Sequence, residues 1–186
     1  GTALIEAYAG RNRNSSSDDF VSDENFASVE IGAGGSLNVL ADGDMWLQLK
    51  NPNAGIRESY FANAVIRAEA TGGDLNAAFV NACAQDDVTV SAGVASIAKI
   101  ESEAETYWLV PTVAATAVTS HNGSVIVASS GSRDVVLPDG KGTVITLNDG
   151  LASINSNSKA GQSPDLSVTA VFANNVSVSG DNAVIS

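Results

Sequence analysis

The sequence predicts a mainly β protein: an antiparallel β-sandwich, jelly-roll-like, with one or two short helices and an N-terminal arm. After Val88, short runs rich in Val, Ile and Thr alternate with Gly, Asn, Asp or Ser, as in sandwiches and barrels. The residues are 44% hydrophobic but only 5% aromatic, so small side chains should fill a thin core between two sheets. A length of 186 residues suits one domain.

The N-terminal segment changes character midway. Residues 2–9 could form a short strand or a helical turn, whereas residues 10–19 are polar and read as a flexible linker. We therefore divide the chain into an arm and linker at 1–19 and one β-sandwich domain at 20–186. The arm is expected to dock on a neighbouring subunit, and its apolar residues Leu4, Ile5 and Tyr8 are candidate assembly contacts. Trp108, expected in a core or an interface, is a fourth candidate.

The elements from Phe26 onward follow from alternation and turn chemistry. Residues 26–50 read as three strands separated by Gly and Asp-Gly turns. Residues 56–70 could be a long strand or a helix. The Ala-rich stretch 72–87 is the best short-helix candidate, because Asp74 can cap a helix there and Leu75, Phe79 and Val80 share a side.

The remaining segments all read as β. Residues 133–147 should form a hairpin around a polar turn at Pro138–Lys141, and Pro111 should mark an edge strand or a bulge. No internal repeat of fixed period is found, which disfavours a solenoid or a propeller.

Charge limits the partners. Acidic residues outnumber basic ones by 21 to 9, giving a formal net charge of −12. Because affinity for nucleic acid depends on Lys and Arg contacts to phosphates, we expect no direct nucleic-acid binding. The same charge argues against anionic membrane surfaces, and no apolar run is long enough to span a bilayer, so no membrane insertion is expected.

The chain offers little for catalysis, cofactors or metals, and we predict none of the three. It has one cysteine, Cys83, expected as a small buried thiol, and one histidine, His121, expected at a turn tip. The two could meet in space, but no local motif supports a catalytic pair. Calcium stays open, although no acidic cluster has the EF-hand spacing.

Residues 123–150 followed by 166–186 show a V-x-L-P strand, a Gly-containing turn, an I-T-L-x-D strand and later V-T-V strands. This C-terminal part resembles β-rich phage virion proteins, namely tail-fibre modules and capsid decoration proteins. The resemblance implies a non-enzymatic structural subunit of a virion, a capsid decoration (cement) or minor coat protein. Its partners would be copies of itself and a major coat protein on the capsid exterior.

Two alternatives stay open. The chain could be an extracellular, pilus-like filament subunit assembled by N-terminal strand donation from residues 1–9, placing it at the cell surface. It could also be a glycan- or receptor-binding β module, with a sugar beside Trp46 or Trp108.

Overall fold

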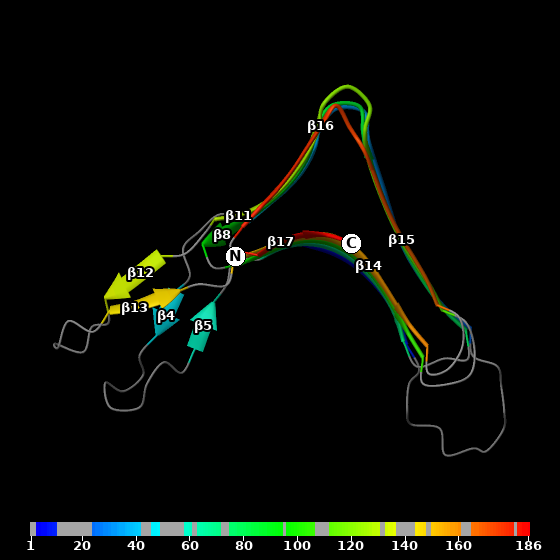
Figure 1. Cartoon of the computed structure of the whole chain (residues 1–186), viewed down its shortest axis with the longest axis horizontal. Helices are drawn as coiled ribbons and strands as arrows, with labels where there is room; N and C mark the ends of the chain where they lie inside the picture. Colours follow the sequence, from blue (N-terminus) through cyan, green and yellow to red (C-terminus); the bar gives the residue numbers. More distant parts are fainter. Residues whose placement is uncertain are drawn as a thin grey trace, which may run out of the picture.

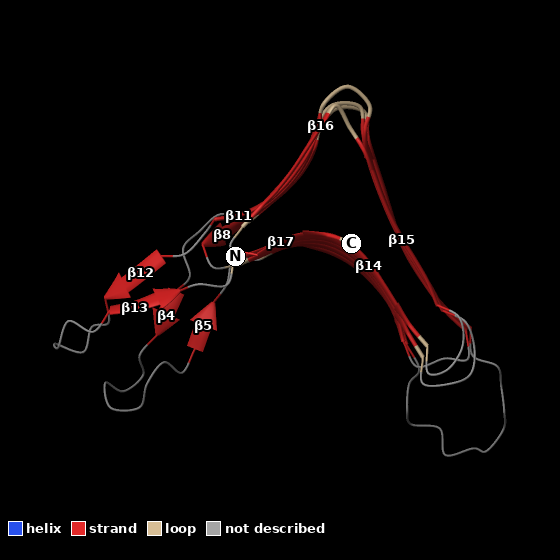
Figure 2. Ribbon diagram, viewed as in Figure 1, coloured by secondary structure: helices blue, strands red, loops and turns tan. Residues whose placement is uncertain are grey.

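The fold consists of strands. A computed structural model describes residues 3–10, 24–41, 46–48, 58–60, 63–71, 75–94, 96–106, 112–130, 133–136, 144–147, 150–160, 165–180 and 182–186. Within these ranges no residue is helical, and seventeen strands account for most of the described residues (Figure 2).

Thirteen of the strands form three parallel sheets. Sheet A contains, in spatial order, β1 (Ala3–Gly10), β6 (Ala64–Thr71), β9 (Ile97–Glu105), β14 (Leu151–Lys159) and β17 (Asn182–Ile185). Sheet B contains β2 (Glu24–Ala33), β7 (Leu75–Ala84), β10 (Thr112–Ser120) and β15 (Asp165–Phe172). Sheet C contains β3 (Leu37–Leu40), β8 (Val88–Val94), β11 (Ser124–Ser130) and β16 (Asn175–Ser179).

The chain visits the three sheets in turn, so that it winds as a coil. Strand β6 lies in sheet A, β7 in sheet B and β8 in sheet C, after which β9 returns to sheet A beside β6. Seen end-on, the coil is triangular, with one sheet along each side (Figure 1). The architecture is therefore a parallel β-helix, in which each turn of the coil packs on the next.

Repeated side-chain ladders fill the narrow interior. In sheet A the residues facing inward follow the pattern Ala-x-Ile in every strand. The register between strands stacks the isoleucines on one another as Ile5, Ile66, Ile100, Ile154 and Ile185. The three central isoleucines are fully buried. Sheet C contributes two inward rows of mostly valine, among them Val88 with Val125 and Val90 with Val127. Strict alternation of buried and less buried residues, as in β10, produces these rows.

The predicted antiparallel, jelly-roll-like sandwich is wrong. Small residues do fill a thin core, as the composition predicts. A three-sided coil, however, is as narrow as a sandwich and selects the same small residues. The solenoid that we disfavoured is the observed architecture. Loops and hairpins of unequal length separate the turns, and they hide the repeat from a search for a fixed period.

The predicted short helices are also wrong for the part of the chain that the structure describes. The candidate at 72–87 contains strand β7, in which Ala78, Ala82 and Ala84 point into the core and are fully buried. Ala favours helices in isolation, but here the tight interior overrides this preference. The ambiguous stretch 56–70 forms two strands, β5 (Glu58–Tyr60) and β6.

Two hairpins leave the coil. Strands β12 (Arg133–Val136) and β13 (Val144–Leu147) pair antiparallel, which confirms the hairpin predicted at 133–147. Strands β4 (Trp46–Gln48) and β5 form a second antiparallel pair. Both hairpins occur between a strand of sheet C and the following strand of sheet A, and both project from the same corner of the triangle (Figure 1).

The corner between sheets B and C is closed by polar groups of successive turns. The Ser124 amide donates to the Asp87 carboxylate at 2.7 Å, and the Gly123 amide donates to the Ser120 hydroxyl at 2.9 Å. The Asn174 side-chain amide donates to the Asn122 carbonyl at 2.8 Å. Turn residues therefore replace the strand ladder where the chain bends.

Candidate functional site

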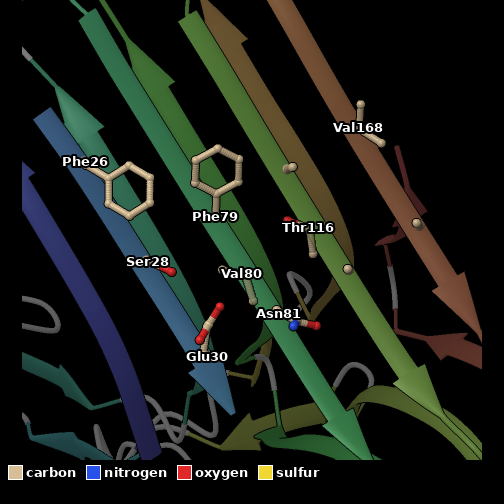
Figure 3. A pocket seen from close by; sticks show the side chains of 11 residues that line it. Phe26, Ser28, Glu30, Phe79, Val80, Asn81, Thr116 and Val168 are labelled. Carbon is tan, nitrogen blue, oxygen red and sulfur yellow. The ribbon is translucent and has the colours of Figure 1, made fainter. Parts of the chain in front are cut away.

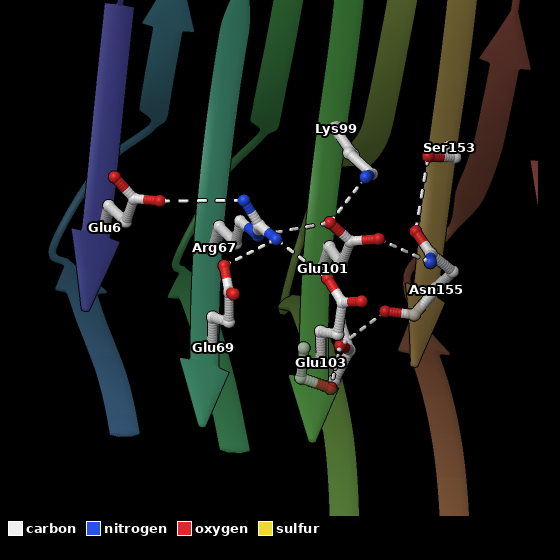
Figure 4. Close-up of polar contacts among 10 residues, drawn as sticks. Glu6, Arg67, Glu69, Lys99, Glu101, Glu103, Ser153 and Asn155 are labelled. Carbon is white, nitrogen blue, oxygen red and sulfur yellow. Dashed lines mark hydrogen bonds and ion pairs between the residues drawn. The ribbon is translucent and has the colours of Figure 1, made fainter. Parts of the chain in front are cut away.

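The outer faces of the three sheets differ in chemistry. Sheet A presents charged side chains, and Arg67 lies at their centre (Figure 4). Its guanidinium lies 2.6 Å from the Glu69 carboxylate, 2.8 Å from Glu103 and 3.8 Å from Glu6. Its Nε faces Glu101 at 3.5 Å, an ion-pair separation too long for a good hydrogen bond. Glutamates from three strands thus converge on one cation.

The Glu101 carboxylate is nearly buried, with 6% of its side chain exposed, and it also pairs with Lys99 at 2.5 Å and accepts from the Asn155 amide at 3.0 Å. Partial burial alone would lower the pKa of Arg67. The hydrogen bond to Glu103 and the charges of Glu69, Glu101 and Glu103 outweigh it and raise the pKa of Arg67 above its ordinary value. The guanidinium therefore stays charged and holds the outer face of sheet A together.

The outer face of sheet C carries small, uncharged side chains. Asn38, Thr89 and Ser91 point outward from β3 and β8, and Leu40, which is 51% exposed, lies at the edge of this face. Ile126 of β11 points outward beside Thr89, and among the described residues of this face none is charged.

The outer face of sheet B is apolar. Register aligns its outward-facing residues in four cross-strand rows, which we call the apolar face: Phe26–Ala77–Val113–Leu166, Ser28–Phe79–Ala115–Val168, Glu30–Asn81–Ala117–Ala170 and Gly32–Cys83–Thr119–Phe172. Glu30 is the one charged residue in these rows. Large side chains remain exposed to solvent, with exposed fractions of 65% for Phe26, 63% for Phe172, 53% for Leu166 and 45% for Val168.

An open groove of about 440 Å³ crosses this face (Figure 3). The rings of Phe26 and Phe79 form one end of it, with centroids 5.3 Å apart and planes tilted by 37°. Val168 and Ala170 line the opposite side, and Glu30 and Asn81 supply polar groups. An exposed apolar patch of this kind is typical of an interaction surface.

The structure describes three of the four predicted assembly contacts, and all three lie on β1. Leu4 and Tyr8 point outward from β1 with 54% and 64% of their surface exposed, whereas Ile5 ends the isoleucine ladder and is 36% exposed. Trp108 lies outside the described residues, and so does the predicted linker at 10–19 except for Gly10, which ends β1. Residues 3–10, expected in an arm, pair with β6 of the same chain along all eight positions.

The structure brings Cys83 and His121 together, with 3.5 Å between Sγ and Nε2. Cys83 lies on β7 and is half-buried, and His121 lies in the turn after β10, as predicted. A catalytic thiol–imidazole pair also needs a group that orients the imidazole. Among the described contacts, the His121 side chain bonds only to Cys83, and the pair carries no catalytic assignment.

Sequence reasoning missed the residues of the apolar face. Its signal was present in the alternation of residues 75–84, where Ala77, Phe79, Asn81 and Cys83 take every second position. The helical interpretation of that stretch concealed this alternation. Read as a strand, it would have placed Phe79 and Cys83 on one outward face.

Further comparisons give no positive identification. Within the described ranges, no three His, Cys, Asp or Glu side chains are placed to hold a metal ion. No helix capable of crossing a bilayer occurs there either. No family model matches the chain, and no curated protein or solved structure matches it.

Proposed function

We propose that this chain is a non-enzymatic structural subunit that occupies a fixed place in a larger assembly. The apolar face of sheet B carries the proposal. It leaves Phe26, Phe172, Leu166 and Val168 largely exposed, and such area on a soluble protein is normally covered by a partner. The β-helix supports this role because backbone pairing between its turns holds the strands of sheet B side by side and so presents the face as one surface.

The assembly that we propose is a virion, with this chain as a decoration or minor coat subunit on its exterior. The resemblance of the C-terminal part supports this setting, and the net charge of −12 suits a protein kept away from nucleic acid. Packing through the apolar face needs no strand to leave the coil. Strand donation by residues 1–9, as in the filament alternative, would break the pairing of β1 with β6.

Electron microscopy of native material tests the proposal. Particles and filaments from the source are separated from free protein on a density gradient, and the chain is located with a specific antibody. We expect it in the particle fraction, at regularly spaced positions. Recovery as a free monomer that turns over a small substrate would overturn the proposal.

A second candidate is a glycan-binding module, which the groove itself favours. The Phe26 and Phe79 rings offer an apolar platform, and Glu30 and Asn81 could bond to hydroxyl groups. A glycan array separates the two functions. Binding that is lost in Phe26→Ala and retained in Tyr8→Ala, a control for an exposed aromatic ring on sheet A, would favour this candidate.

A further inference from the structure

We propose that the apolar face pairs with the apolar face of a second copy of this chain about a two-fold axis. The inference rests on the proposed function and names the partner of the same surface. An isologous contact of this kind uses one surface patch twice, so a single apolar side of the coil is sufficient to form it.

The area of the face fits such a pair. Sheet B has four strands, and β10 and β15 pair over eight residues. With strands about 4.8 Å apart and a rise of about 3.3 Å per residue, the face measures roughly 19 by 26 Å, or about 500 Å² per copy. Two copies would bury about 1,000 Å² in total, the lower limit for a specific interface, so we expect affinity in the micromolar range.

Charge limits the faces through which two copies can meet. Two chains of net charge −12 repel each other, and a contact through sheet A would bring their glutamates together. The rows of the apolar face contain one carboxylate, Glu30, on the edge strand β2. A contact through sheet B therefore adds little like-charge repulsion, and sheet B also offers the large exposed side chains Phe26 and Phe172.

Shape supports the same arrangement. A Cβ added to Gly32 would meet nothing within 4 Å, so the space above this position is open to a side chain of a second copy. A two-fold axis between two packed faces lies in their common plane. Two orientations of this axis are possible when it passes through the centre of the face. An axis parallel to the strands places Gly32 opposite Phe172 of the second copy, and an axis perpendicular to the strands places Gly32 opposite Phe26 of the second copy.

Sedimentation velocity over a range of concentrations tests the proposal with two matched variants. Leu166→Glu introduces a charge on the apolar face, and Leu40→Glu introduces the same charge on sheet C, where the original leucine is almost equally exposed, 51% against 53%. We expect the unaltered chain and Leu40→Glu to form dimers with the same affinity. Leu166→Glu should weaken the dimer by about tenfold or more, because it buries an unpaired carboxylate.

A second variant and a second measurement guard against misfolding. Gly32→Val fills open space in the single chain and should leave its thermal unfolding unchanged, yet weaken the dimer. Cys83, the single cysteine, lies on the same face, so its rate of labelling by a thiol reagent should fall as the unaltered chain associates. In Leu166→Glu the labelling rate should fall only at concentrations about tenfold higher or more.

The outcomes separate this inference from the proposed function. A monomeric chain, or a dimer weakened equally by Leu166→Glu and Leu40→Glu or by neither, overturns the pairing of the two faces. The structural role would still stand if the native protein is found in particles. If a glycan or another protein instead protects Cys83 while the chain stays monomeric, the face has a different occupant and the inference is wrong.

Discussion

Replacing Ile100 with Ala tests whether the isoleucine ladder supports the coil. Ile100 is fully buried in sheet A, and register stacks it directly between Ile66 and Ile154. The substitution removes three carbon groups, worth about 2.4 kcal/mol at about 0.8 kcal/mol each. The strands on either side are held at their spacing by backbone pairing, so the site cannot collapse and a cavity remains. We expect a total loss of about 3–4 kcal/mol, within the usual range for such substitutions.

Ile185→Ala is the matched control. It makes the same chemical change on the same ladder, but in β17, where Ile185 is 52% exposed. About half of the transfer energy is lost and no enclosed cavity forms, so we expect a loss of about 1 kcal/mol. Urea unfolding followed by circular dichroism measures both variants, with unchanged slopes indicating that the midpoints report stability. Equal losses, or a loss below about 1 kcal/mol for Ile100→Ala, would show that the ladder does not carry the core.

Two further substitutions probe sheet A and the corner between sheets B and C. Arg67→Met should lower the free energy of unfolding by about 2 kcal/mol in urea, because it leaves the nearly buried Glu101 with fewer opposing charges. Combining Arg67→Met with Glu101→Gln should recover part of this loss. A double variant that recovers nothing would contradict the assigned ion pair. Gly123→Ala should lower the melting temperature, because a Cβ there would lie 2.8 Å from the Asp86 carbonyl carbon. Gly34→Ala is the control, since a Cβ at Gly34 meets open space and should leave the melting temperature almost unchanged. Similar melting temperatures for the two alanine variants would refute the assigned crowding.

The sequence predicts the strand content well and the topology poorly. The hairpin at 133–147 is local, since its turn and both strands lie within one short stretch, and it was predicted correctly. Whether two strands that are far apart in the sequence pair in parallel or antiparallel depends on the path of the chain that connects them. Residues 75–84 read as a helix because Ala-rich sequence favours helices in isolation, whereas the coil selects Ala for its size.

A repeat was present in the sequence, but not at a constant spacing. Five copies of the motif Ala-x-Ile, beginning at Ala3, Ala64, Ala98, Ala152 and Ala183, start the inward face of a strand in sheet A. The hairpins lengthen some turns and leave others short. The motif also begins at Ala54 and Ala95, so the motif alone does not single out the five strands of sheet A. The apolar face could be identified only afterwards, because its rows depend on the register between turns.

The corner from which both hairpins project is a natural site for engineering. The first and third turns place an insertion there, while the second turn passes directly from β8 to β9, between Val94 and Ile97. Coils with and without an insertion stack in the same register on either side. A peptide tag or a small reporter domain grafted between Val94 and Ile97 should therefore be displayed beside the hairpins without altering the stacking of the coil.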